Sequence, residues 1–212
     1  MSAPQSYYVP VDAGEAEFTE KRSRFLGHVR RVETEAEARA FLDEMRKKYY
    51  DARHNCWCYV LHEGGIVRYG DDGEPQGTAG QPMLNVFQRE GVENVVCVVT
   101  RYFGGVLLGA GGLTRAYARS AKDALDAAGK ARMRLWSAVT VDCPYPMLER
   151  LKLLAAAHGG TVEGTDFGAA VSIRILLPQE NAASFDAALT ELSAGTMTAR
   201  REGERFLPGP RE

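Results

Sequence analysis

Hydrophobic positions along the chain follow two periods, one typical of helices and one typical of strands. The clearest helix is predicted over residues 34–50, where the apolar side chains fall on one helical face. These side chains are Ala38, Phe41, Leu42, Met45 and Tyr49. Thr34 and Glu37 form a capping-box pattern at the start of this helix. The β-branched run at 94–103 instead predicts a buried strand.

Other strands precede that run. They are predicted over 5–11, over 15–31 with a break near Glu20–Lys21, and over 53–63, where Gly64-Gly65 forms a hairpin turn. A short helix is predicted at about 82–90, and a longer helix at 113–128.

The pattern changes after Gly129. It predicts a strand at about 132–142, a helix at about 145–157, strands near 160–165 and 169–177, a helix at about 179–193 and a strand at 198–206. This order, β-α-β-β-α-β, is typical of a ferredoxin-like fold. The sequence therefore predicts an α+β protein of two domains, 1–130 and 134–206, followed by a frayed tail at 207–212.

Glycine is concentrated in one part of the chain. Twelve of the 22 glycines lie between Gly64 and Gly112, mainly in the segments 71–80 and 104–112. Glycine at this density serves special backbone angles or close approach of the backbone to a ligand. Because each segment follows a predicted strand, both loops can open on the same side of a sheet. Tight turns without a ligand are the alternative interpretation.

The second loop opens a helix, and backbone N–H groups at a helix start favour an anion. Arg101 before the loop and Arg115 after it could neutralise a phosphate. The candidate ligand- or phosphate-binding residues are Arg101, Gly104, Gly105, Gly109, Gly111, Gly112 and Arg115. Arg119 and Lys122 continue the basic stripe, although we expect these two to be ordinary solvated charges.

The first loop, DDGEPQGTAG, is acidic at its start. Asp71, Asp72 and Glu74 could bind a divalent cation or act as acid and base, or they could form a solvated turn or a capping device. The small residues that follow add open N–H donors, so this loop is the second half of the candidate site. Its members are Asp71, Asp72, Glu74, Gly77, Thr78 and Gly80.

The sequence does not match the P-loop, the dinucleotide-binding fingerprint or the nucleophile elbow. Ala110 stands where a P-loop requires lysine, and Thr114 stands where a dinucleotide fingerprint requires glycine. His54, Cys56 and Cys58 share a strand face but have neither zinc spacing nor a fourth ligand, so we expect free cysteines and no metal. No nucleophile elbow occurs. We therefore predict no catalytic residue and no cofactor.

Charge and composition narrow the function classes. Among 212 residues, 26 Lys and Arg face 28 Asp and Glu, which excludes nucleic-acid binding through bulk positive charge. Any such binding needs a local basic patch. The sequence has no apolar run of membrane-spanning length and no secretory pattern near its start, so we expect a cytoplasmic protein without a membrane partner.

Four segments resemble the IMPACT/YigZ family, specifically its bacterial YigZ-type members. They are KRSRFLGHV, the strand with His54-Asn55-Cys56, DDGEPQGTAGQP and VVTRYFGGVLLGAGGLTRAY, and the spacing between them also matches. The resemblance covers the whole chain. Cys58 stands where the family pattern suggests a small residue, so we expect no shared role for it.

The resemblance implies specific folds. The N-terminal domain should be an α/β sandwich similar to domain two of a small-subunit ribosomal protein, to domain IV of elongation factor G and to the GHMP kinases. The C-terminal domain should resemble domains III and V of elongation factor G.

The resemblance also implies a function. Eukaryotic members act in translational control by competing for a ribosome-associated activator of a stress kinase, which bacteria lack. We therefore expect a translation-linked binding protein that contacts RNA, a ribosomal component or a phosphate-bearing ligand through the loops 71–80 and 101–115. A protein partner in translational control is also expected. Tyr102 and Phe103 are candidates for stacking on unpaired bases, and core packing at a strand end is the alternative for both. The alternative, motivated by the GHMP kinases, is an enzyme acting on a phosphorylated small molecule or nucleotide, with Asp72 or Glu74 holding Mg²⁺.

Overall fold

The computed structural model describes residues 7–212, which contain two β-sheets and five α-helices. The chain divides into two units. The first comprises residues 7–132 together with Pro208–Glu212, and the second comprises Met133–Leu207. The chain passes between them twice, once within β7 (Lys130–Cys143) and once within β10 (Ala199–Arg211).

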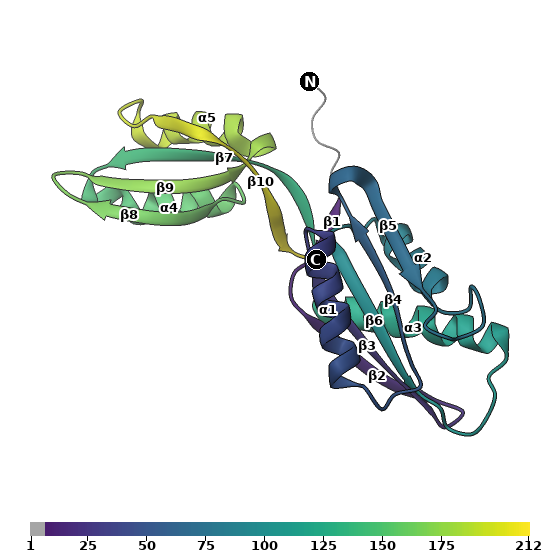
Figure 1. Cartoon of the computed structure of the whole chain (residues 1–212). Coiled ribbons are helices and arrows are strands. Elements are labelled where there is room, and N and C mark those ends of the chain that lie inside the picture. The colour runs from purple at the N-terminus through teal and green to yellow at the C-terminus, as the bar shows by residue number, and fades with distance from the viewer. Residues whose placement is uncertain (1–6) are drawn as a thin grey trace. The chain divides into compact units, whose positions relative to one another are not determined.

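The first unit is built on an antiparallel sheet of order β2-β3-β6-β4-β5. Its strands are β2 (Gly14–Glu20), β3 (Ser23–Arg31), β4 (His54–Leu61), β5 (Ile66–Gly70) and β6 (Val95–Tyr102). Helix α1 (Glu35–Lys48) lies on one face, and helices α2 (Gly80–Glu90) and α3 (Ala110–Ala128) lie on the other, as Figure 1 shows. The predicted break near Glu20–Lys21 is the turn between β2 and β3.

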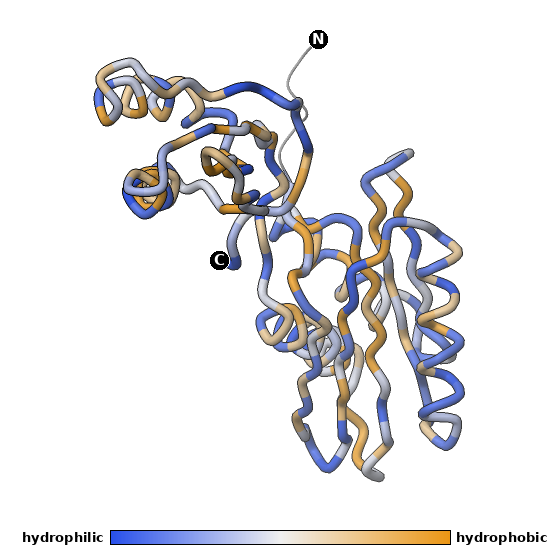
Figure 2. Tube along the Cα trace, turned by 90° about the vertical axis from the view of Figure 1, so that its left-hand side faces the viewer, coloured by the Kyte–Doolittle hydropathy of each residue, from blue (hydrophilic) through white to orange (hydrophobic). Residues whose placement is uncertain are grey.

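The central strand β6 explains the β-branched run in the sequence. Val95, Cys97 and Val99 pack toward α2 and α3, whereas Val96 and Val98 pack toward α1. A strand covered on both faces needs apolar residues at consecutive positions rather than at alternate ones. Figure 2 shows the contrast, since hydrophobic stretches run along the strands while hydrophobic and hydrophilic residues alternate along the helices.

The predicted capping box of α1 is confirmed. The Thr34 hydroxyl accepts from the Glu37 N–H at 3.2 Å, and the Glu37 carboxylate accepts from the Thr34 N–H at 3.2 Å. Helix α3, by contrast, begins three residues before the predicted start. Gly111 and Gly112 therefore lie in its first turn and not in the loop. Glycine lowers helix propensity but does not block a helix that packs against a sheet.

The second unit follows the predicted order of elements. After β7 come α4 (Leu148–Ala157), β8 (Thr161–Phe167), β9 (Val171–Pro178), α5 (Ala182–Ser193) and β10, and the sheet order is β8-β9-β7-β10. Short 3-10 turns at Tyr145–Met147 and Gln179–Asn181 occupy the predicted starts of the two helices. Apolar residues of both helices pack on one face of this sheet.

The expected frayed tail is wrong. Residues 208–211 belong to β10, and the Glu212 N–H donates to the Lys130 carbonyl at 2.8 Å. The Arg211 guanidinium donates to the Ala127 carbonyl at 2.9 Å and to Asp12 at 3.3 Å. Proline and glycine suggested disorder, but β10 is an edge strand, where proline is tolerated because no ladder N–H is lost.

The strand expected before β2 is present in shortened form. The predicted strand 5–11 is observed as β1 (Tyr8–Pro10), which pairs with the start of β7, while its residues 5 and 6 lie outside the described part of the chain.

Between residues 7 and 212, no helix has the length and apolar character needed to cross a membrane.

A tight turn positions the loop that follows β6. Lys21 and Arg22 form the two-residue turn between β2 and β3, both with positive φ (44° and 66°). Such turns usually carry asparagine and glycine, so this backbone is strained. Gly104 packs directly on the Arg22 carbonyl group, and a Cβ at this position would overlap it. The turn and the β6–α3 loop are thereby fixed against each other.

Replacing Gly104 by alanine should therefore destabilise the first unit by about 1–3 kcal/mol, because two backbone segments must separate. The measurement is urea unfolding followed by circular dichroism. Gly111→Ala is the matched control, since its added methyl would meet only the flexible Arg115 guanidinium, at 3.5 Å. Equal stability of the two variants would contradict the close packing of loop and turn.

Candidate functional site

The two glycine-rich loops converge on one pocket of about 410 Å³. The β5–α2 loop contributes Gly73, Glu74 and Pro75, and the β6–α3 segment contributes Phe103, Leu107, Leu108 and Gly109. Arg53 and His54 close it from the start of β4. A pocket of this size suits a small ligand or one unit of a larger ligand. The expectation that both loops open on the same side of the sheet is confirmed.

Glu74 forms the floor of this pocket. Its side chain is only 3% exposed, and Oε1 accepts hydrogen bonds from Arg101 Nη1 at 2.6 Å and from the Tyr117 hydroxyl at 2.8 Å. Glu74 thus connects its loop to β6 and to α3. Burial raises the pKa of Tyr117, which keeps its hydroxyl protonated as the donor to Glu74.

Arg101 lies inside the protein and not on its surface. Its side chain is 5% exposed, and Nη2 donates to the Ser23 hydroxyl at 3.2 Å. The guanidinium carbon lies 5.5 Å from the ring centroids of both Phe25 and Phe103. We expected Arg101 to neutralise a phosphate, but the structure pairs its charge with Glu74.

His54 lies beside Arg101 because β4 and β6 place the two residues in register. Its Nδ1 is 2.7 Å from the carbonyl oxygen of Asp72. Its Nε2 is 3.9 Å from Glu74 Oε1, which is too long for a hydrogen bond. A Cβ at position 73 would lie 3.4 Å from the His54 ring. The positive φ of Gly73 (83°) also favours glycine at this position.

The other two acidic residues of the first loop bind backbone groups. Asp71 accepts from the N–H groups of Gly77 (2.8 Å), Ala79 (3.1 Å) and Gly80 (2.8 Å), so it caps the start of α2. Asp72 accepts from the Asn55 N–H at 2.6 Å. The Thr78 hydroxyl donates to the Pro75 carbonyl at 2.6 Å. Of the alternatives for this loop, the structure supports a capping device.

The start of α3 retains unused donors. Leu113 is the first residue of this helix whose N–H is bonded, to the Gly109 carbonyl at 3.0 Å. Within residues 7–212, the N–H groups of Ala110, Gly111 and Gly112 have no acceptor. Gly105 and Gly109 have positive φ (82° and 73°) and shape the approach to this helix.

The two stacking candidates face different ways. Tyr102 is half-buried, and its hydroxyl donates to Asp51 at 2.9 Å. Phe103 is 46% exposed and lines the pocket. Leu107 in the same segment is 82% exposed. Phe103, rather than Tyr102, is therefore available to a ligand.

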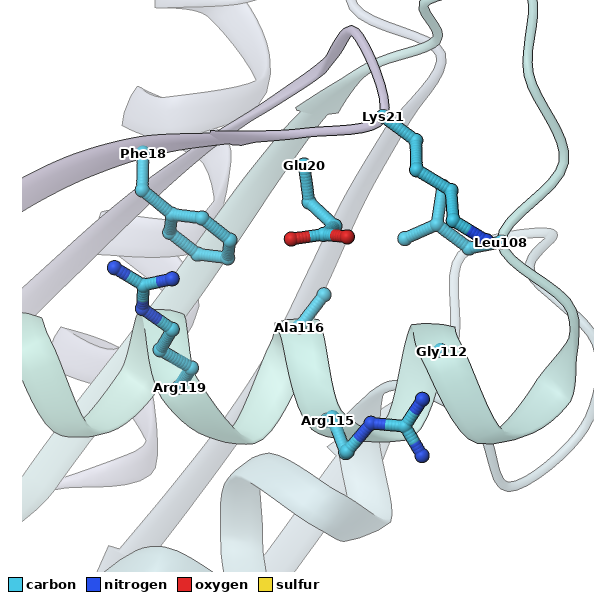
Figure 3. A pocket seen from close by; sticks show the side chains of 8 residues that line it. All are labelled: Phe18, Glu20, Lys21, Leu108, Gly112, Arg115, Ala116 and Arg119. Carbon is cyan, nitrogen blue, oxygen red and sulfur yellow. The ribbon is translucent and has the colours of Figure 1, made fainter.

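A second hollow of about 220 Å³ adjoins the first, and Leu108 lines both. Lys21 lines it from the β2–β3 turn, and Arg115 and Arg119 line it from α3 (Figure 3). The Glu20 carboxylate, at the end of β2, points toward α3. Basic side chains from two elements therefore border one hollow.

These basic residues differ in their partners. Arg119 pairs with Asp123 at 3.3 Å, and Lys122 pairs with Asp126 and with Glu90, as expected for a solvated helix face. By contrast, the exposed cations Lys21, Arg22, Arg53 and Arg115 form no ion pair within the described residues. We call these four residues the basic rim.

The cysteine-rich strand does not assemble a metal site. Cys56 donates to the Asp71 carbonyl at 2.9 Å, and burial raises the pKa of its thiol. Burial beside Cys97 likewise raises the pKa of Cys58. The described residues contain no group of three His, Cys, Asp or Glu side chains placed to hold a metal ion.

Several residues of this site were not singled out from the sequence. Arg53 carries no local motif. Lys21, Arg22 and Ser23 lie in the family-like segment KRSRFLGHV, and Tyr117 ends the segment VVTRYFGGVLLGAGGLTRAY, but neither segment assigned them a role. Period-2 alternation along β6 could have shown that Arg101 and Phe103 share a face, but it could not identify Glu74 as their neighbour.

Comparisons with known proteins match both units. Residues 21–125 match the Impact N-terminal domain, and residues 141–196 match a domain of unknown function, DUF1949. The chain is 36% identical over 200 residues to IMPACT family member YvyE of Bacillus subtilis, covering 94% of this chain and 92% of that protein. It is 35% identical over 180 residues to IMPACT family member YigZ of Escherichia coli, covering 84% and 88%.

Two further matches are a mammalian protein and a solved structure. Protein IMPACT of Rattus norvegicus is 32% identical over 112 residues, which is 51% of this chain and 35% of that protein. A solved structure described as a crystal structure of an hypothetical protein aligns with a TM-score of 0.59 and 32% identity, covering 94% of this chain and 97% of its own.

Removing Arg101 tests the central ion pair. Arg101→Met should destabilise the first unit by about 3–5 kcal/mol, because the Glu74 carboxylate is left buried without a counter-charge. Arg101→Met with Glu74→Gln should be more stable than the single variant, since no uncompensated charge remains. Urea unfolding of both variants measures the difference. A double variant as unstable as Arg101→Met would contradict the assigned role of Glu74.

Proposed function

We propose that this chain, which belongs to the IMPACT family, is a translation-linked binding protein. It contacts single-stranded RNA, free or as part of a ribosomal component, through the loops 71–80 and 101–115. The translational role of eukaryotic members, expected from the resemblance, supports the cellular context. The geometry of the two loops supports the mode of binding.

The basic rim is the observation that carries this proposal. Lys21, Arg22, Arg53 and Arg115 are exposed and form no ion pair within residues 7–212. Most arginines elsewhere on the surface have acidic partners, for example Arg24 with Glu17 and Arg30 with Glu44. Four cations left unpaired near one pair of hollows form the local basic patch that a chain of net charge −2 needs to attract phosphates.

Exposed apolar residues beside the rim favour a single strand over a duplex. Phe103 and Leu107 are 46% and 82% exposed and lie at the mouth of the larger pocket. Unstacked bases bind such side chains, whereas the bases of a duplex cannot reach them. Gly105 and Gly109 in the same segment let the strand approach the backbone closely.

The fold names belong to the same proposal. A β-α-β-β-α-β unit with sheet order β8-β9-β7-β10 supports a ferredoxin-like second unit. The five-stranded sheet with helices on both faces supports a first unit like domain two of the ribosomal protein. The kinase alternative gains no support from the carboxylates, because Asp72 binds the Asn55 backbone and Glu74 binds Arg101.

Binding should depend on salt and on the basic rim. For a single strand, the slope of log affinity against log salt is about −0.7 per phosphate contact. Arg53→Gln and Arg115→Gln should each weaken the binding of a labelled single-stranded RNA and reduce this slope by about 0.7. Fluorescence anisotropy at several salt concentrations measures both quantities.

Lys122→Gln is the matched control, because it removes a charge from the same helix as Arg115 but one that is already paired. Its affinity and salt slope should remain those of the unmodified protein. RNA binding that ignores salt, or that survives loss of both Arg53 and Arg115 unchanged, would refute the proposed contact surface.

A further inference from the structure

Two hydrogen-bond acceptors at the floor of the larger pocket have no donor partner in the described residues. Glu74 Oε1 is occupied by Arg101 and Tyr117, but Oε2 accepts no hydrogen bond in the described structure. Oε2 is not sealed from solvent, although the Glu74 side chain is only 3% exposed. Because Glu74 lines the pocket, a ligand bound there can reach its carboxylate.

The second acceptor is His54 Nε2. Nδ1 lies 2.7 Å from a backbone carbonyl oxygen, which only accepts, so Nδ1 carries the proton. In the neutral ring Nε2 is then an acceptor. Nε2 lies 3.9 Å from Glu74 Oε1 and makes no hydrogen bond. His54 Nε2 and the Glu74 carboxylate therefore lie close together at the floor, and Nε2 and Oε2 both lack a donor.

A pair of adjacent donors is the complement of this floor. Of the four RNA bases, guanine alone has two adjacent donors on its Watson–Crick edge, N1–H and the N2 amino group. Adenine and cytosine place one amino group beside an acceptor, and uracil places one N–H between two carbonyls. Bases removed from a stack are recognised through this edge.

The rest of the pocket fits the other parts of a nucleotide. Phe103, Leu108 and Leu113 supply apolar walls for a flat ring. Arg53 at the mouth and the unbonded N–H groups at the start of α3 favour an anion such as a phosphate. A simple amine would satisfy the floor but would leave the apolar walls and the anion-binding groups unused.

We propose that this pocket binds a guanine nucleotide, with the Watson–Crick edge of the base donating to Glu74 Oε2 and His54 Nε2. The proposal deepens the proposed function, and rests on it, by making one unstacked guanine of a single-stranded RNA the specific contact. The basic rim then supplies affinity that does not depend on sequence, and the pocket floor supplies selectivity.

The first test changes the ligand and leaves the protein intact. Labelled oligouridines with one central guanosine, inosine or adenosine are compared by fluorescence anisotropy. The guanosine oligomer should bind about tenfold more tightly than the adenosine oligomer. Inosine, which lacks only the N2 amino group, should fall between them. Equal binding of all three oligomers would overturn the guanine site.

The second test changes one acceptor into a donor. In Glu74→Gln, the amide oxygen can keep Arg101 and Tyr117 as partners, so the amide NH₂ replaces Oε2. The preference for guanosine over adenosine should disappear, while the salt-dependent affinity for plain oligouridine remains. If thermal melting shows that this variant is unfolded, His54→Phe removes the other acceptor and should reduce the same preference. A preference unchanged in a folded variant would refute the assignment.

Titration calorimetry with guanosine and adenosine monophosphates separates this inference from the proposed function. Guanosine monophosphate binding without RNA binding supports the pocket and overturns the RNA function. Salt-dependent RNA binding without any guanine preference supports the RNA function and overturns the pocket assignment. If neither the oligomers nor guanosine monophosphate bind, both are wrong. Lys122→Gln should behave as the unmodified protein in every arm.

Discussion

The buried ion pair between Glu74 and Arg101 is the constraint on which the rest of the site depends. Moving both charges out of water is costly, and the cost is offset only while each charge keeps the other and its neutral partners. Those partners come from separate elements, namely Tyr117 on α3 and Ser23 at the start of β3. The pair thus holds one loop, the sheet and a helix in one arrangement.

Polar groups on the two loops therefore divide between structure and recognition. Asp71 and Asp72 bind backbone N–H groups and fix the first loop, so they have little capacity for an external ligand. The N–H groups at the start of α3 have no such side-chain cap and remain open. A carboxylate closes one helix terminus while the neighbouring terminus stays available. This asymmetry makes the β6–α3 side of the pocket the side suited to an anion.

Local patterns predicted the framework better than they predicted the site. The capping box of α1 and the β-branched run of β6 depend on nearby residues, and both could be recognised from sequence. The tail at residues 208–211 could not, because its proline-rich composition suggests disorder unless its strand partner is known. Gly111 and Gly112 misled for a similar reason, since packing against the sheet outweighs their poor helix propensity.

The site residues show the same limit. Convergence of the two loops followed from their positions after strands, but the fate of each charge did not. Arg101 and Arg115 are the same residue type beside the same loop, yet one is buried against Glu74 and the other is exposed without a partner. Only the tertiary arrangement, which brings a loop 27 residues earlier in the chain onto Arg101, decides between them.

The attachment of residues 208–212 to the first unit has a consequence for biosynthesis. Arg211 contacts Asp12 across 199 residues and Ala127 across 84, so the first unit is closed by a segment made after the entire second unit. Contacts of such separation form late, because a long loop must be ordered first. During translation the second unit can fold through its own local contacts before residues 208–212 contact the first unit. The last contacts of the first unit can therefore form only after the second unit has been synthesised.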